Sequence, residues 1–252
     1  MADQPQQDNP TLNIAQRTRS QTEDERLLQS PVEEPQAADF TRSDPWRVFR
    51  IMGEFVEGFD NLARIGPAVT IFGSARVPPG EPQYQQATEM ARRLGEAGFT
   101  IITGGGPGIM EAANKGAHEA GVPSVGLGIE LPHEQGMNEY VDLGLNFHYF
   151  FTRKVMFVRY ASGFVVFPGG FGTMDELFEA ATLRQTEKIR YFPIVLVGSD
   201  YWSGLVGWLR ESMLGDRYVS PEDLDAIAVC DDLERVIEIV EDVEHRRPRR
   251  AA

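Results

Sequence analysis

One short stretch of the chain combines residue types that could bind a phosphate and act on the group attached to it. Residues 169–172 read Gly-Gly-Phe-Gly, follow an apolar run at 164–167, and precede Thr173 and Glu176. Glycines between a strand and a helix let backbone N–H groups point at an anion, and the helix N-terminus adds partial positive charge. A carboxylate beside such a loop suits a ligand that carries both a phosphate and a group to be polarised, such as a ribose.

The same stretch also has a purely structural interpretation. Thr173-Met-Asp-Glu176 matches a capping box, in which Thr and Glu reciprocally satisfy the free donors of a helix start. Capping does not require three preceding glycines, so both interpretations stay open. Near a helix N-terminus, the Glu176 carboxylate is expected to be ionised.

The elements that must position these residues follow from hydrophobic patterning. Apolar runs without polar alternation, separated by segments with helical spacing, predict a parallel sheet covered on both faces. Strands are expected near residues 68–72, 99–103, 124–129, 147–151, 164–167, 193–197 and 226–230. Helices are expected near 84–96, 109–119, 201–213 and 233–244, with one more starting at 173 and another carrying Arg153 and Lys154. We therefore predict a doubly wound, Rossmann-like α/β fold whose ligand lies at the carboxyl ends of the strands.

Composition divides the chain into four predicted parts. Residues 1–44 contain one aromatic residue, Phe40, and are expected to be a disordered tail whose deletion (residues 1–40) leaves assembly and activity intact. An amphipathic helix is predicted at 45–65, a catalytic domain at 66–246 and a basic tail at 247–252. The apolar residues of the helix have two open interpretations, packing on the chain's own core or a subunit contact. They are Val48, Ile51, Met52, Phe55, Val56, Phe59 and Leu62.

Charge and cysteine content narrow the classes of partner. The net charge of −14 argues against nucleic acid and anionic membranes as partners. No apolar run reaches the length of a transmembrane helix, and the single Cys230 suits a reducing, cytoplasmic setting. The four histidines are scattered without metal-ligand spacing, so no metal is expected.

Four segments, in matching order, resemble the LONELY GUY family of cytokinin riboside 5′-monophosphate phosphoribohydrolases. They are Phe-Gly-Ser-Ala at 72–75, Gly-Gly-Gly-Pro-Gly-Ile-Met-Glu-Ala-Ala at 104–113, Arg153-Lys154, and Pro-Gly-Gly-Phe-Gly-Thr-Met-Asp-Glu at 168–176. The resemblance spans roughly residues 65–245. It implies hydrolysis of the N-glycosidic bond of an adenosine-type 5′-monophosphate to free base and ribose 5-phosphate, without a cofactor.

The resemblance also assigns roles to residues. Glu176 would stabilise an oxocarbenium-like sugar, hold the ribose hydroxyls and position water. Arg153 would bind phosphate or the departing purine, although a surface ion pair is its simpler interpretation. The candidate substrate-binding residues are Gly73, Ser74, Gly105, Gly106, Met110, Lys154, Gly169, Gly170, Gly172 and Thr173.

The leading hypothesis is therefore an N-ribosidase with a preference for N6-modified adenine nucleotides. One rival is a nucleosidase of broad specificity that acts on AMP itself. Another is a nucleotide or pterin-cofactor carrier, which would be expected to lack the Arg/Glu pair. Members of the family are often labelled lysine decarboxylases, but this chain offers only Lys115, Lys154 and Lys188 for a Schiff base. Longer members resemble a hexameric subgroup, so a homo-oligomer, dimer or hexamer, is expected.

Overall fold

The computed structural model describes residues 22–28, 44–131 and 136–246. The predicted basic tail at 247–252 and most of the predicted N-terminal tail lie outside these residues. The strands are β1 (Ala68–Phe72), β2 (Thr100–Thr103), β3 (Ser124–Ile129), β4 (Leu143–Phe147), β5 (Gly163–Val166), β6 (Ile194–Leu196) and β7 (Ile227–Val229). The helices are α1 (Glu23–Leu27), α2 (Asp44–Leu62), α3 (Pro82–Glu96), α4 (Ile109–Ala120), α5 (Phe150–Tyr160), α6 (Phe171–Gln185), α7 (Ser199–Trp208), α8 (Pro221–Asp225) and α9 (Leu233–Arg246), with a π-helical segment at Leu209–Leu214.

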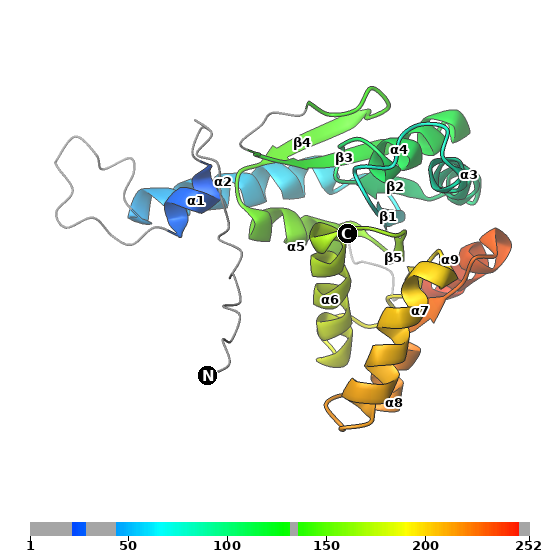
Figure 1. Cartoon of the computed structure of the whole chain (residues 1–252). Coiled ribbons are helices and arrows are strands. Elements are labelled where there is room, and N and C mark those ends of the chain that lie inside the picture. Colours follow the sequence, from blue (N-terminus) through cyan, green and yellow to red (C-terminus); the bar gives the residue numbers. More distant parts are fainter. Residues whose placement is uncertain (1–21, 29–43, 132–135, 247–252) are drawn as a thin grey trace, which may run out of the picture.

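The strands form one seven-stranded sheet in the order β4-β3-β2-β1-β5-β6-β7, and every pair is parallel. The chain builds outward from β1 to β4, then returns to the other side of β1 and builds outward again (Figure 1). The strand order therefore reverses between β1 and β5, where ligands of such sheets bind. The predicted doubly wound, Rossmann-like fold is confirmed.

Each face of the sheet has its own apolar core, because successive side chains of a strand point to opposite faces. On one face, Phe72 and Phe164 pack with residues of α5, α6 and α7. On the other, Val69 and Val165 pack with residues of α3, α4 and α9. This double coverage explains why the strands are apolar at consecutive positions.

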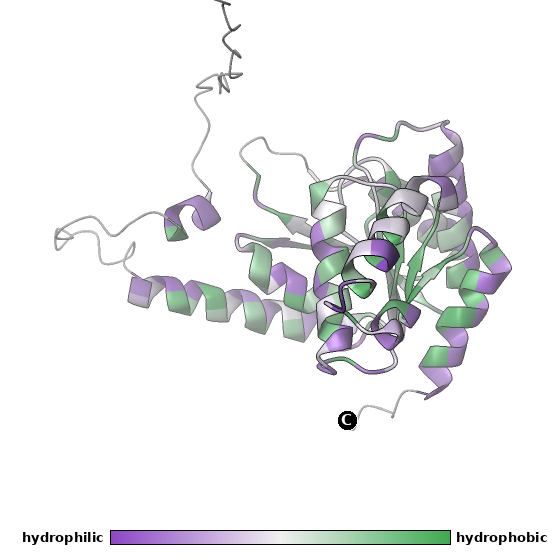
Figure 2. Cartoon of the chain, turned by 60° about the horizontal axis from the view of Figure 1, so that its bottom comes forward, coloured by the Kyte–Doolittle hydropathy of each residue, from purple (hydrophilic) through white to green (hydrophobic). Residues whose placement is uncertain are grey.

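Helix α2 extends past the edge of the sheet, with α1 beside it (Figure 1). Only one side of α2 is packed: Gly58 and Leu62 are buried and the Cβ of a residue at 58 would touch Met156 of α5. On the rest of its surface apolar positions alternate with polar ones along the helix (Figure 2). The structure thus supports the packing interpretation for Leu62, while Val48, Met52, Val56 and Phe59 stay exposed.

Two predictions from the sequence were wrong in detail, and one helix was missed. The aromatic run 147–151 is not a strand: Phe147 ends β4, and Phe150 begins α5. Part of the predicted disordered tail is structured, since Glu23–Leu27 forms a helix capped by Thr22. The short helix α8 was not predicted, although Ser220 and Asp223 form a capping box there.

Candidate active site

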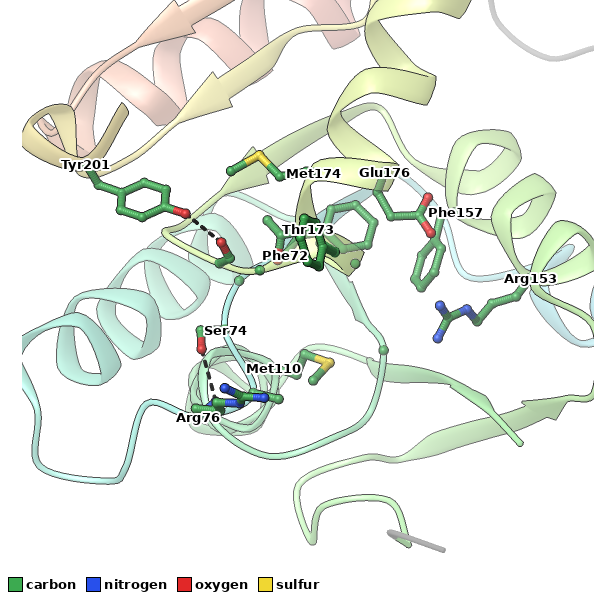
Figure 3. Close-up of a pocket in the computed structure, with 17 residues that line it drawn as sticks. Phe72, Ser74, Arg76, Met110, Arg153, Phe157, Thr173, Met174, Glu176 and Tyr201 are labelled. Carbon is green, nitrogen blue, oxygen red and sulfur yellow. Dashed lines mark hydrogen bonds between the residues drawn. The ribbon is translucent and has the colours of Figure 1, made fainter. Parts of the chain in front are cut away.

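A cavity of about 750 Å³ opens at the point where the strand order reverses. Its walls come from the turn after β1, the start of α4, helix α5, the loop between β5 and α6, and α7. The β1 and β5 turns are joined directly, because the N–H of Ser74 donates to the carbonyl of Pro168 at 2.9 Å. The lining residues are Phe72, Gly73, Ser74, Ala75, Arg76, Gly104, Met110, Arg153, Phe157, Gly169, Gly170, Phe171, Gly172, Thr173, Met174, Glu176 and Tyr201 (Figure 3).

The three glycines of the β5–α6 loop differ in what the fold requires of them. A Cβ at Gly169 would lie 2.1 Å from Thr173 Oγ1, so any side chain there would collide with the helix start. A Cβ at Gly170 or Gly172 would meet nothing within 4 Å, and neither residue has a positive φ. Gly170 is an acceptable N-cap, but Gly172 lies inside the helix, where glycine is unfavourable. The packing of the chain therefore gives no reason for glycine at position 172.

The capping-box interpretation of Thr173 and Glu176 is wrong. Helix α6 begins at Phe171 with Gly170 as its N-cap, and the N–H of Met174 donates to the carbonyl of Gly170. Thr173 is thus inside the first turn and Glu176 one turn further on. No side chain caps the helix. The N–H groups of the first turn are left for another partner.

Glu176 is a buried carboxyl group, 3% exposed, whose Oε2 has no hydrogen-bond partner among the described residues. Burial raises its pKa to about 7, although the positive charges of Lys154 and Arg153 act in the opposite direction. The expectation of a fully ionised carboxylate is therefore wrong near neutral pH. A carboxyl group that titrates there can be used in either protonation state.

Arg153 lies on α5 with its guanidinium directed into the cavity, on the same side as Glu176 (Figure 3). Its Cζ lies 5.0 Å from the ring centroid of Phe150 and 5.4 Å from that of Phe157. Its Nε has no partner, and within the described ranges no carboxylate forms an ion pair with it. The surface ion-pair interpretation is thus not supported, and burial lowers the pKa of this group.

Lys154, next to Arg153, points elsewhere. Its Nζ lies 2.9 Å from Asp175 Oδ1 and 2.7 Å from Glu179 Oε2, and it lines a second hollow on the side of α6. The structure therefore does not place Lys154 with the other candidate residues. Its charge still acts on Glu176.

Only part of the glycine segment after β2 lines the cavity, and the rest makes hydrogen bonds within the protein. Gly104 lines the cavity, but Gly105 and Gly106 do not. The Gly105 N–H donates to Thr103 Oγ1, and the carbonyls of Gly105 and Gly106 accept from Asn138 Nδ2. Those backbone groups are occupied within the protein.

Gly108 supports the turn after β1. Its φ is +71°, and a Cβ there would lie 2.4 Å from the carbonyl oxygen of Ser74. The next residue, Ile109, donates its N–H to that same oxygen at 3.1 Å. Only glycine allows this close approach, so Gly108 fixes the position of Ser74 in the cavity wall.

Two polar lining residues were missed from the sequence. Arg76 follows Ser74 in the β1 turn, and its backbone N–H donates to Ser74 Oγ at 3.1 Å. Tyr201, on α7, donates its hydroxyl to the carbonyl of Gly169 at 2.6 Å (Figure 3). The position of Arg76 two residues after Ser74, in the Gly-Ser-Ala-Arg segment at 73–76, was an available signal. Nothing near Tyr201 in the sequence indicates the contact.

In the part of the chain that the structure describes, no three His, Cys, Asp or Glu side chains are grouped so that they could hold a metal ion. Among the same residues, no helix is both long and apolar enough to span a membrane.

Comparison with known sequences identifies relatives that cleave N-glycosidic bonds. A cytokinin riboside 5′-monophosphate phosphoribohydrolase from Mycobacterium tuberculosis is 31% identical over 162 residues, 60% of this chain and 84% of that protein. A probable enzyme of the same name from Oryza sativa subsp. japonica is 30% identical over 57% of this chain and only 59% of its own length. A pyrimidine/purine nucleotide 5′-monophosphate nucleosidase from Escherichia coli is 31% identical over 47% of this chain and 28% of its own length. By their names, these relatives are N-glycosyl hydrolases, the class expected from the sequence.

Among solved structures, the molybdenum cofactor carrier protein of Chlamydomonas reinhardtii matches with a TM-score of 0.53 and 21% identity, over 71% of this chain and 98% of that one. At this identity the likeness concerns the fold alone. The family model described as "Possible lysine decarboxylase" matches residues 110–240, more than half of the chain. The chain therefore belongs to this family, the LONELY GUY family that its motifs resemble.

Proposed function

We propose that this protein hydrolyses the N-glycosidic bond of purine nucleoside 5′-monophosphates and releases the free base and ribose 5-phosphate. The observation that carries the proposal is the set of groups that line one cavity. A glycine loop at a helix N-terminus, an arginine with no ion-pair partner among the described residues and a buried carboxyl group that titrates near pH 7 all line it.

The phosphate is assigned to the N-terminus of α6. The first-turn N–H groups there have no side-chain cap, and Gly172 leaves space beside them. Arg76 lines the same cavity from the β1 turn and supplies a positive charge that the acidic chain as a whole lacks. Gly73, Ser74, Gly169, Gly170 and Thr173 form the rest of this end of the site.

Glu176 and Arg153 are assigned to the reacting centre. As the bond from the sugar to the base nitrogen breaks, its electron pair leaves with the base and positive charge develops on the sugar. The ionised Glu176 carboxylate stabilises that charge and orients the water that attacks the anomeric carbon. Arg153 stabilises the negative charge on the departing base, and the base takes up the proton that the attacking water loses. Cation–π contacts with the rings of Phe150 and Phe157 hold the guanidinium in place.

For the base, we infer a preference for N6-modified adenine, supported by the relatives named as cytokinin riboside 5′-monophosphate phosphoribohydrolases. Broad nucleosidase activity is the second candidate, and the Escherichia coli relative supports it. The carrier alternative rests on a structural likeness that concerns the fold alone. This chain also keeps the Arg153 and Glu176 pair that a carrier is expected to lack.

The assembly we propose is a cytoplasmic homo-oligomer, a dimer or hexamer, with α2 at a subunit contact. Phe49, Met52 and Val56 are 64%, 54% and 66% exposed and follow one another at spacings of three and four residues. That spacing is typical of a seam between helices. The exposed apolar stripe continues to Phe59 near the packed end of α2.

The proposal is tested by comparing AMP with adenosine under the same conditions. Because phosphate binding energy places the sugar, adenosine should be cleaved at least about 100-fold more slowly. A monophosphate of N6-isopentenyladenosine then measures the preference for the base. Equal turnover of adenosine and AMP would remove the α6 N-terminus from the mechanism.

A further inference from the structure

The first turn of α5 is held by carboxylates from parts of the chain far away in sequence. The helix begins at Phe150, and its N-cap, Tyr149, makes no side-chain capping bond. Instead the N–H of Phe150 donates to Asp24 Oδ2 at 3.0 Å, across 126 residues. Glu54 of α2 accepts the N–H of His148 at 2.8 Å and the hydroxyl of Thr152. Negative charge at this end also complements the helix dipole.

Asp24 reaches this position because helix α1 is itself fastened. Glu23, 4% exposed, accepts bonds from Arg26 and from Arg50 of α2, the latter at 2.7 Å. The N–H of Glu23 donates to Glu130, just beyond β3, at 3.1 Å. Short helices are not stable alone, so these contacts are what hold α1 in place.

The turn that Asp24 holds is the one that carries Arg153. The Arg153 guanidinium lies over the ring of Phe150, the residue whose N–H donates to Asp24. The charge of Asp24 also acts on Arg153 directly. A change at Asp24 therefore reaches the cavity through one turn of helix and one aromatic ring.

We propose that Asp24 is a positioning residue, which fastens the N-terminus of α5 and so orients Arg153 in the active site. The inference rests on the proposed function for the role given to Arg153. It also reverses the expectation that residues 1–40 are dispensable. Removal of this segment should weaken the site even though none of its described residues, 22–28, lines the cavity.

The experiment compares Asp24→Ala, Asp24→Asn and the wild-type chain. Asn keeps an oxygen that can accept the Phe150 N–H, whereas Ala keeps none. We expect Asp24→Ala to lower kcat for AMP hydrolysis about tenfold, the effect of one lost bond to a charged group, and Asp24→Asn to restore most of it. Leu28→Ala, at an 84% exposed position of the same segment, is the matched control and should behave as wild type.

A double-mutant cycle with Arg153→Ala separates positioning from general destabilisation. If Asp24 acts through Arg153, Asp24→Ala should lower kcat for AMP hydrolysis about tenfold in the wild-type background and not in the Arg153→Ala background. Equal losses in both backgrounds, or no loss in either, would overturn the proposal.

Amide hydrogen exchange gives a readout that needs no activity. Protection of residues 150–153 should fall in Asp24→Ala and be retained in Asp24→Asn. Unchanged protection in Asp24→Ala overturns the proposal whether or not AMP is hydrolysed. If protection falls as expected but the wild-type protein releases no base, the proposed hydrolysis fails while the fastening of α5 by Asp24 stands.

Discussion

Gly172→Ala should make the protein more stable and less active. Gly172 is the second residue of α6, is exposed, and has nothing within 4 Å of the position of a Cβ. Replacing glycine by alanine in a helix stabilises it by at most about 1 kcal/mol, so Tm should rise by roughly 1–3 °C for a domain of this size. The fold alone thus predicts a small improvement.

The proposed phosphate site predicts the opposite effect on catalysis. A methyl group at this end of the cavity would obstruct a phosphate at the α6 N-terminus. Loss of one hydrogen bond to a charged group is worth about 1.5–3 kcal/mol, or roughly 10–150-fold in kcat/KM for AMP.

Gly204→Ala on α7 is the matched control for this prediction. It is also a helical, exposed glycine with nothing within 4 Å of a Cβ position, and it lies outside the cavity. It should raise Tm in the same way and leave kcat/KM within about twofold of wild type. Thermal unfolding and steady-state hydrolysis of AMP measure both quantities. If Gly172→Ala is as active as Gly204→Ala, the phosphate does not bind where we place it.

Four further predictions follow from the site and its surroundings. Because the folded pKa of Glu176 is raised from 4.5 to about 7, kcat/KM should increase about tenfold per pH unit below 7 and level off above it; a rate that falls with pH would mean that the protonated form acts. The same shift means that the contribution of Glu176 to stability is present below pH 4.5 and is lost as the pH rises through about 7. Glu176→Gln should therefore be more stable than wild type at pH 8, by up to about 3 kcal/mol in urea unfolding. An unchanged unfolding midpoint would contradict the shift. Gly108→Ala should lower stability by about 1–3 kcal/mol and also impair AMP binding, since a Cβ would push against Ser74; normal binding would show that Ser74 does not contact the substrate. Val56→Asp should dissociate the proposed oligomer in light scattering without unfolding the chain, and an unchanged mass would place the contact elsewhere.

The parts of the fold that the sequence predicted well are those with continuous apolar runs. The strands at 68–72, 124–129 and near 164–167 are buried on both faces, so their composition alone distinguishes them. The strand predicted at 147–151 failed because β4 is an edge strand with alternating burial, while the aromatic residues after it belong to a helix that is apolar on one side. Aromatic residues occur in both strands and helices, so they do not distinguish the two. Pairing with β3 is what places Leu143–Phe147 in the sheet.

For the candidate site, the sequence placed the loop but not its electrostatics. Gly73, Ser74, Met110, Arg153, Glu176 and the 169–173 segment do line one cavity. The ionisation of Glu176 was predicted wrongly, because its pKa depends on burial by elements that only the fold brings together. Lys154 was wrongly expected in the site and Tyr201 was missed for a similar reason. The lysine pairs with Asp175 and Glu179 on α6, and the tyrosine reaches the cavity from α7.

The central claim is that Glu176 takes part in cleaving a nucleotide at its N-glycosidic bond. The most direct test incubates wild-type protein and Glu176→Gln separately with AMP and with isopentenyl-AMP at pH 8, and quantifies free base and ribose 5-phosphate by chromatography. The wild type should release the two products in equal amounts. Glu176→Gln should bind the nucleotide yet release base roughly 10²–10⁴-fold more slowly, because the amide has the shape of the carboxylate without its charge. Release of no base by the wild type, or release by Glu176→Gln within a few-fold of it, would contradict the claim.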